Sequence, residues 1–255
     1  MMSDKRVNIH KSTIIEDGAK IASDVIIGPF CFIGKDVELK SGCTVESNVI
    51  LKGRVVVESN VKIFSFAVIG SESSEIHIGE KTHIREFVQI GAQESLDAKN
   101  KKIVIGANNF LMGYVQILSG VELDDFCIVT NAVRLYENVK CEERVIIGGL
   151  STIEANNKIG TGVMVGGASV VASDIPPFML VEGNKATIKG LNVIGLRRRL
   201  EKKGDIEEIK SVFKRILGDG ADKILAQEIA DTNPNEFIKK LASFVASSNI
   251  KQKVR

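Results

Sequence analysis

Residues 9–70 decide the fold, and they read IHKSTIIEDGAKIASDVIIGPFCFIGKDVELKSGCTVESNVILKGRVVVESNVKIFSFAVIG. Every sixth residue of this stretch, from Ile9 to Ile69, is a large aliphatic residue, and no polar residue interrupts the series. A period of six matches neither the α-helical period of about 3.6 residues nor the simple alternation along one long strand. It matches a coil whose cross-section is a triangle of three short strands. The stretch therefore predicts a parallel β-helix built from hexapeptide repeats.

The same period continues beyond Ile69 with two interruptions. It resumes over Ile78–Ile90 and again over Ile105–Val171, which extends the prediction to about nine coils. Glycines such as Gly28 and Gly148 directly follow an aliphatic position, where we expect the chain to turn. The fold class predicted for the chain is mainly β: a left-handed parallel β-helix of hexapeptide repeats with a C-terminal α-helical domain.

A second register of small side chains lies two residues before each aliphatic position. Cys31, Cys43 and Cys127 belong to this register, and Cys141 belongs to the aliphatic one. The cysteines are far apart in the sequence and form no C-x-x-C pair, so neither a disulfide framework nor a zinc site is indicated. We expect four buried free thiols in the core.

The interruptions and the end of the period divide the chain. Residues 71–76 and 91–103 are polar and out of register, which predicts two surface loops that are either plain insertions or part of a site. Proline cannot supply ladder hydrogen bonds, so Pro176 and Pro177 should end the repeat. The predicted domains are the β-helix at 1–177, a linker at 178–190 and an α-helical domain at 191–255.

The C-terminal part shows helical periodicity in two places. Ile206, Ile209 and Ile216 indicate one amphipathic helix, and Phe237 and Leu241 indicate another. Their apolar faces must pack on each other or on a neighbouring subunit.

Charge and hydropathy indicate the cellular location of the protein and the kind of partner that it binds. The chain has neither a signal-peptide pattern nor a run of about 18 apolar residues, so we expect a cytoplasmic protein with no transmembrane segment. We also expect no nucleic acid partner. Residues 191–255 carry 14 Lys and Arg against 9 Asp and Glu, whereas the whole chain has a net charge of +2. This basic tail is either a set of solvated helix faces or a surface that attracts a nucleotide diphosphate or an acidic protein.

Several short motifs resemble one known family, the acyl-carrier-protein-dependent UDP-N-acetylglucosamine O-acyltransferases of lipid A biosynthesis. The resemblance covers nearly the whole chain and is strongest in its C-terminal third. The matching motifs are Ile27-Gly28-Pro29-Phe30, Ile84-Arg85-Glu86, Val165-Gly166-Gly167, Asp174-Ile175-Pro176-Pro177, Glu182-Gly183-Asn184-Lys185-Ala186, Gly190-Leu191-Asn192 and Gly195-Leu196-Arg197-Arg198-Arg199.

The resemblance implies a homotrimer with sites in the clefts between subunits, acting on acyl carrier protein thioesters without metal or organic cofactor. It also implies that Asn192, Arg198 and Arg199 contact a UDP-sugar, since they match family residues with that role. Arginine suits this task because its guanidinium forms paired, charge-assisted bonds to phosphate oxygens. A general base must take the proton from the sugar 3-hydroxyl, and in the family that base is a histidine.

The family pattern Met-x-x-x-His-Ile-x-His-Asp is altered in this chain. The segment Met112–Gly120 aligns with it without a gap, and Gln116, Ser119 and Gly120 replace the two histidines and the aspartate. Further family positions hold Asn138, Glu154 and Ala155 in place of His, His and Gln. The sequence has no histidine after His83, so the catalytic residue is unknown and we expect reduced or lost activity.

Alternative functions remain open at this stage. The chain is an acyltransferase of this family with a relocated base and reduced activity, a non-catalytic homologue that binds nucleotide sugar or acyl carrier protein, or a hexapeptide transferase with altered substrates. Fold alone does not separate them, because function depends on the site.

Overall fold

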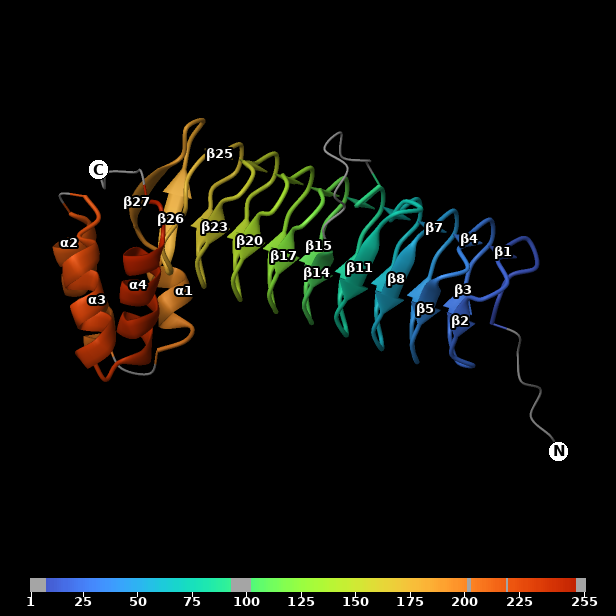
Figure 1. Ribbon diagram of the computed structural model, residues 1–255, viewed down its shortest axis with the longest axis horizontal. Helices are drawn as coiled ribbons and strands as arrows, with labels where there is room; N and C mark the ends of the chain where they lie inside the picture. The colour runs from blue at the N-terminus through green and yellow to red at the C-terminus, as the bar shows by residue number, and fades with distance from the viewer. Residues whose placement is uncertain (1–7, 93–101, 201–202, 219, 251–255) are drawn as a thin grey trace.

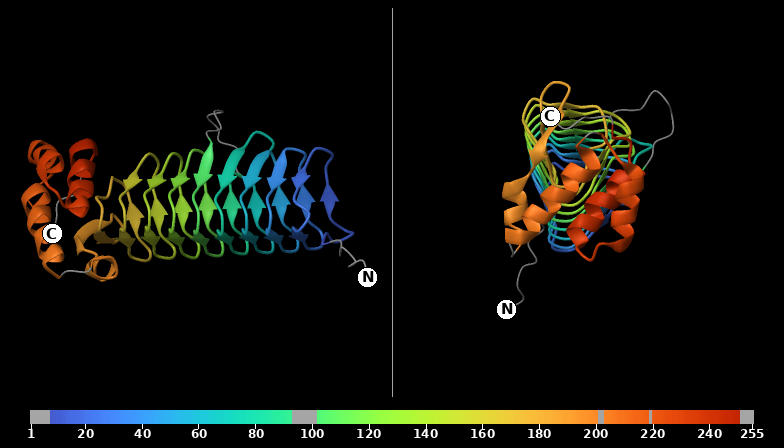
Figure 2. Two further views of the ribbon diagram at one scale, coloured as in Figure 1. Left: turned by 90° about the horizontal axis from the view of Figure 1, so that it is seen from below. Right: turned by 90° about the vertical axis from the view of Figure 1, so that its left-hand side faces the viewer.

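The computed structural model describes residues 8–92, 102–200, 203–218 and 220–250, and Figure 1 shows a long prism of stacked coils with helices at one end. Three parallel sheets form the sides of the prism, and viewed along its axis the coils superpose as a triangle (Figure 2). The predicted left-handed parallel β-helix with C-terminal helices is confirmed.

Each sheet takes every third strand of the chain, so neighbouring strands come from successive coils. The first sheet contains, in order, β1 (Ile14–Ile15), β4 (Phe32–Ile33), β7 (Ile50–Leu51), β10 (Val68–Ile69), β13 (Gln89–Ile90), β16 (Gln116–Ile117), β19 (Arg134–Leu135), β22 (Thr152–Ile153) and β25 (Val170–Val171). The second contains β2 (Lys20–Ile21), β5 (Val37–Leu39), β8 (Arg54–Val57), β11 (Glu75–Ile78), β14 (Ile103–Ile105), β17 (Glu122–Leu123), β20 (Lys140–Cys141) and β23 (Lys158–Ile159).

The third sheet is the longest because two further strands extend it at the C-terminal end. Its order is β27 (Thr187–Leu191), β26 (Met179–Glu182), β24 (Met164–Val165), β21 (Ile146–Ile147), β18 (Ile128–Val129), β15 (Phe110–Leu111), β12 (His83–Ile84), β9 (Lys62–Ile63), β6 (Thr44–Val45) and β3 (Ile26–Ile27). Strand β26 runs parallel to β24, and β27 returns antiparallel beside it.

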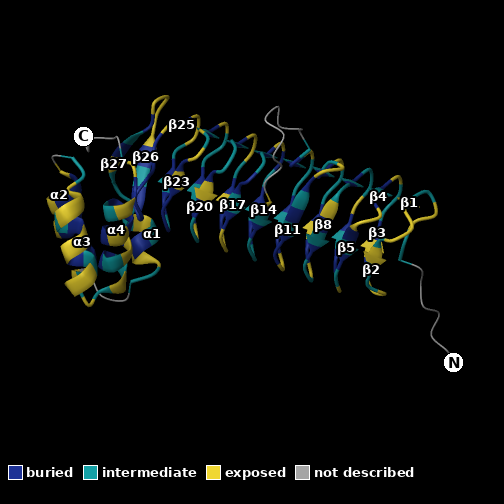
Figure 3. Ribbon diagram, viewed as in Figure 1, coloured by how far each residue is buried: buried dark blue, intermediate teal, exposed yellow. Residues whose placement is uncertain are grey.

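The hexad period is the packing period of the core. The second residue of most two-residue strands points inward and is buried, as Ile117 and Leu135 are, and the small register is buried with it at Val115 and Val133. Buried residues recur in the coils from Val25 onward, and Figure 3 shows them as dark blue segments along the prism. Each fully buried aliphatic side chain contributes about 1.5–3 kcal/mol, which makes the repeated core the main source of stability.

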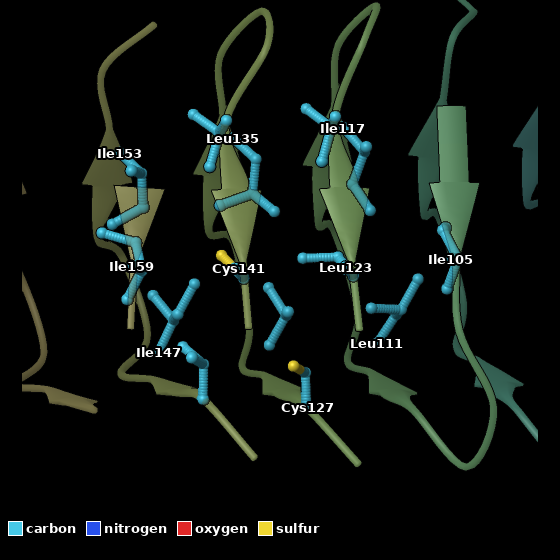
Figure 4. Packing of buried hydrophobic residues seen from close by; sticks show 14 of the residues in the cluster. Ile105, Leu111, Ile117, Leu123, Cys127, Leu135, Cys141, Ile147, Ile153 and Ile159 are labelled. Carbon is cyan, nitrogen blue, oxygen red and sulfur yellow. The ribbon is translucent and has the colours of Figure 1, made fainter. Parts of the chain in front are cut away.

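The four cysteines are free and buried, as predicted. The sulfur atoms of Cys127 and Cys141 lie among aliphatic side chains (Figure 4). Burial raises the pKa of the Cys127 thiol to about 12, so this thiol stays protonated at neutral pH and acts as a small apolar residue.

The glycines after the aliphatic positions fall into two groups. Gly70 and Gly91 take the left-handed backbone at the turn, with φ at 84° and 59°. At Gly148 the left-handed backbone instead falls two positions later, on Leu150, where φ is 62°. Gly148 is required instead by the close approach of the next coil, because an added Cβ would lie 2.5 Å from the backbone nitrogen of Gly167. The constraint on this glycine is therefore space between coils.

Two expected segments look different in the structure. Strand β11 begins at Glu75, so it includes the last two residues of the predicted loop 71–76. Residues 178–190, predicted as a linker, contain β26 and most of β27, because Val181 and Ile188 are fully buried and extend the core. Most of the predicted loop 91–103 lies outside the described residues.

Four helices follow the last strand: α1 (Val193–Arg197), α2 (Lys203–Leu217), α3 (Lys223–Thr232) and α4 (Glu236–Ser247). They cover the C-terminal end of the prism (Figures 1 and 2). The two predicted helices correspond to α2 and α4, and their buried residues Ile209 and Leu241 join one core cluster within the chain. None of the described helices is long and apolar enough to cross a membrane.

Candidate functional site

Asn192, Arg198 and Arg199, predicted from the sequence as a nucleotide-sugar site, line one cleft of about 240 Å³. One wall of the cleft is the segment around α1, and the other is the edge of the prism between the second and third sheets, where Arg144 lies. We call it the arginine cleft, after Arg144, Arg198 and Arg199.

The Asn192 side chain is held by backbone groups. It caps α1, with Oδ1 accepting from the backbone N–H of Gly195 at 3.0 Å. Its Nδ2 donates to the backbone oxygen of Gly162 at 3.1 Å, which ties α1 to the edge of the β-helix. The amide is thus pre-oriented, because both of its ends are already bonded.

Arg199 is also engaged with the protein. Its Nη2 donates to Glu143 Oε1 at 3.4 Å, and its Cζ lies 5.7 Å from the Phe178 ring and 5.3 Å from the Phe237 ring. The Nη1 atom is buried and has no hydrogen-bond partner among the described residues. Burial lowers the pKa of this guanidinium, although its pKa starts so high that the group stays charged. Its charge is therefore directed mainly at Glu143.

Arg198 and Arg144 face the same cleft with exposed side chains. In the part of the chain that the structure describes, no carboxylate lies within 4.0 Å of either guanidinium. The Arg144 Cζ lies 4.5 Å from the centre of the Phe126 ring, in a cation–π contact. Sequence reasoning missed Arg144 and Phe126. Their spacing of 18 residues, three hexads, is the signal that stacks them in successive coils.

Ser119 lies at a different edge of the prism, in the turn between β16 and β17, which joins the first sheet to the second. Gln116 is on β16 and pairs in register with Gln89 and Arg134 on the neighbouring strands. Gly120 has a left-handed backbone with φ at 73°. We call this line of turns the Ser119 edge.

Glu137 is the residue of the next coil that stacks on Ser119. The register that pairs Ile117 with Leu135 brings Ser119 next to Glu137, and the backbone N–H of Asn138 donates to the backbone carbonyl oxygen of Ser119 at 3.0 Å. Asn138 Nδ2 in turn donates to Asn156 Oδ1 at 2.9 Å. No local sequence pattern indicates Glu137 as a neighbour of Ser119, because the two residues meet only when the coils stack.

The histidines lie away from this edge. His77 is on β11 of the second sheet, with Nε2 3.8 Å from Glu58. His83 is on β12 of the third sheet between the rings of Phe64 and Phe110, and burial lowers its pKa. His10 lies at the N-terminal end of the prism and contacts Ser12 at 2.8 Å. The structure therefore brings no described histidine to Ser119.

A larger cleft of about 750 Å³ lies between the β-helix and α4. Its β-helix wall carries Asp124, Asp125, Glu142 and Glu143, and we call it the acidic cleft. Burial raises the pKa of Asp124, with smaller contributions from the nearby Glu142 and Asp125 carboxylates. Within the described ranges, no group of three or more His, Cys, Asp or Glu side chains is arranged to hold a metal ion.

Comparison with known proteins agrees with this architecture. The family model "Udp N-acetylglucosamine O-acyltransferase; Domain 2" matches residues 174–252. The acyl-(acyl-carrier-protein)–UDP-N-acetylglucosamine O-acyltransferase of Aliarcobacter butzleri is 45% identical over 251 residues, covering 94% of this chain and 96% of that protein. The protein of the same name from Sulfurovum is 38% identical, with coverage of 94% and 95%.

The solved structure of UDP-N-acetylglucosamine acyltransferase from Campylobacter jejuni has the same fold. It superposes with a TM-score of 0.89 at 30% identity, covering 97% of this chain and 99% of that one. Sequence similarity therefore extends over the β-helix and the helical end together. The chain belongs to the family of acyl-carrier-protein-dependent UDP-N-acetylglucosamine O-acyltransferases.

Proposed function

We propose that this protein binds UDP-N-acetylglucosamine and acyl carrier protein, as its family does, and transfers the acyl chain slowly or not at all. The observation that carries the proposal is the Ser119 edge, where a serine replaces the family's base and the three histidines lie elsewhere. A serine hydroxyl has no useful proton affinity at neutral pH. Losing a positioned general base typically costs about 10²–10⁴-fold in rate.

The geometry supports a homotrimer. The arginine cleft lies at the edge between the second and third sheets, whereas Ser119 lies at the edge between the first and second. These two edges of a prism do not face a common space within one chain. A site that uses both must combine edges from neighbouring subunits, as a closed threefold ring allows. We therefore propose a trimer of about 83 kDa, three times the chain mass of 27.7 kDa.

The remaining partners follow from family membership. The proposed reaction attacks a carrier-protein thioester with a sugar hydroxyl, a step for which the resemblance implies no metal or organic cofactor. The acceptor, UDP-N-acetylglucosamine, binds in the arginine cleft. Asn192, Arg198 and Arg199 either contact it directly or hold the cleft residues that do. We also propose a cytoplasmic location, where acyl carrier protein is found.

The second candidate function is a non-catalytic binding protein. It is favoured by a specific contrast: the predicted nucleotide residues are present in a formed cleft, while Gln116, Ser119 and Gly120 have replaced the catalytic residues of the family. A hexapeptide transferase with altered substrates is the third candidate, because the Ser119 edge carries the acidic residues Glu137 and Glu154.

A direct assay separates these candidates. The purified protein is incubated with UDP-N-acetylglucosamine and carrier-protein thioesters of several chain lengths, and acylated nucleotide sugar is measured. We expect turnover far below about 1 s⁻¹, the lower end of the usual range for enzymes. Turnover at or above that rate would show that another residue acts as the base. Calorimetric binding without transfer would favour the binding protein, and transfer to a different acceptor would favour the third candidate.

A further inference from the structure

The arginine cleft contains three guanidinium groups, but they are not equivalent. The Arg199 side chain is only 21% exposed, less than the 35% of its ion-pair partner Glu143. It contacts Glu143 and the rings of Phe178 and Phe237. Glu143 already engages Nη2 of Arg199, and Nη1 is buried, so a phosphate that recruited Arg199 would have to displace Glu143 or reach a buried N–H group. The structure thus gives Arg199 a positioning role, in which it joins α1 to the β-helix and to α4.

Arg144 is arranged differently. It lies on the rim of the cleft in a left-handed turn, with φ at 60°, and its backbone N–H donates to the backbone carbonyl oxygen of Asp125 at 2.9 Å. Phe126 supports the guanidinium from one side at 4.5 Å. Stacking on a ring restricts the planar group and leaves its N–H edges available for an anion. Ordering this side chain therefore costs less entropy when a ligand binds.

The rest of the cleft fits an anion that carries an apolar, planar part. Arg198 is a second exposed cation on the opposite wall. Apolar side chains line the space between the two arginines: Ile128, Ile146, Phe178 and Leu196. The volume of about 240 Å³ is smaller than the roughly 300–1,000 Å³ of a typical ligand pocket, so one chain supplies only part of the site.

We propose that Arg144, together with Arg198, binds the diphosphate of the nucleotide sugar, and that Arg199 positions the cleft without contacting the phosphates. This inference rests on the proposed function, since it names the phosphate-binding residue of the same site. It assigns a role to a residue that sits on the β-helix, 54 positions before Arg198 in the sequence. It also predicts that the ligand bridges α1 and the β-helix edge.

Calorimetric titration of the full-length protein with UDP-N-acetylglucosamine tests the inference. Arg144→Ala should weaken binding by about ten-fold or more, the usual effect of removing a hydrogen bond to a charged group. Arg197→Ala is the matched control, because Arg197 is exposed next to Arg198 but does not line the cleft. It should bind with nearly the wild-type affinity. Arg144→Lys should fall between Arg144→Ala and the wild type, because a single ammonium replaces the forked guanidinium.

The salt dependence separates a phosphate contact from a structural effect. The affinity ratio between the wild type and Arg144→Ala should shrink as salt rises, because added ions screen the attraction between Arg144 and the diphosphate. A ratio that stays constant, or an unchanged affinity in Arg144→Ala, overturns the inference and leaves the proposed function intact. A wild-type protein that binds no UDP-N-acetylglucosamine overturns both. Binding that depends on Arg199 alone overturns only the assignment to Arg144.

Discussion

Arg199 donates to Glu143 across 3.4 Å although the two residues are 56 positions apart. The same carboxylate oxygen accepts from Lys240 Nζ at 2.8 Å. Glu143 therefore connects three parts of the molecule: the β-helix, the segment after α1, and α4. Its pKa is lowered, first by the Lys240 hydrogen bond and further by the Lys240 and Arg199 charges.

Glu143→Gln should destabilise the protein by about 1–3 kcal/mol, because it leaves the partly buried Arg199 without its anion. Urea denaturation at neutral pH measures the change. Glu122→Gln is the control: the exposed pair between Glu122 and Lys140, at 2.8 Å, should contribute no more than about 1 kcal/mol. Equal effects of the two substitutions would show that Glu143 does not hold the helical end.

The contribution of Glu143 should depend on pH with a definite sign. Its pKa in the folded state lies below the ordinary value of 4.5, so the stabilisation is complete above about pH 4.5 and is lost as the pH falls through the lower folded-state value. The stability difference between the wild type and Glu143→Gln should therefore narrow below pH 4.5. A gap that stays constant down to pH 3 would contradict the assignment.

Asp124→Asn should stabilise the folded protein at pH 7 only slightly, because Asp124 is exposed and solvent screens most of the effect. Burial raises the pKa of Asp124 above its ordinary value of 3.8, so the charged form is less favourable in the folded state than in the unfolded one. The gain should disappear as the pH falls below 3.8, where the group is neutral in both states. Thermal melting of both proteins at pH 7 and pH 3 is the measurement, and a loss of stability at pH 7 would refute the argument.

Ser119→His and Gly120→Asp, which restore the family's residues, should raise the rate of acyl transfer substantially only when they are combined. Ser119→His supplies an imidazole, but Gly120→Asp is needed to orient it, so the double variant should exceed the single one by about ten-fold or more. The backbone allows the change, because Asn138 and Asn156 take φ values of 59° and 64° at the equivalent turns of the next two coils.

Ser119→His combined with Gly120→Asn is the control for that experiment. It has nearly the same shape but no carboxylate, and it should behave like the single histidine variant. If the asparagine control matches the aspartate variant, orientation by an acid is not the missing element. If neither transfers acyl chains, the loss extends beyond these two positions, for example to Gln116.

Gly148→Ala should destabilise the β-helix by about 1–3 kcal/mol, since the added methyl group would lie 2.5 Å from the Gly167 nitrogen in the next coil. Gly149→Ala is a close control, because the nearest atom to its added Cβ is the Asn131 oxygen at 3.2 Å. Denaturation curves should show a clearly larger effect for Gly148. The reverse order would mean that coil spacing is not what requires this glycine.

The sequence alone determined the architecture and the family. The period of six is a local property that repeats along the chain, so each inward position, such as Ile117 or Leu135, can be identified from its neighbours. The motifs around Pro176–Pro177 and Arg197–Arg199 carried the family resemblance for the same reason, as they are contiguous. For the same reason, the sequence could predict that Ser119 and Gly120 stand in place of the family's catalytic residues.

Only the tertiary structure decided which polar residues share a site. Glu137 becomes a neighbour of Ser119 because residues 18 positions apart stack in successive coils. Arg144 lines the arginine cleft because α1 docks on one particular edge of the β-helix. The sequence predicted that Arg199 contacts the nucleotide sugar, yet its guanidinium contacts Glu143, a partner that no local pattern indicates. The physical reason is that an aliphatic side chain needs only an apolar interior, which the repeat supplies everywhere. A charged side chain needs one specific partner, and long-range packing determines where that partner lies.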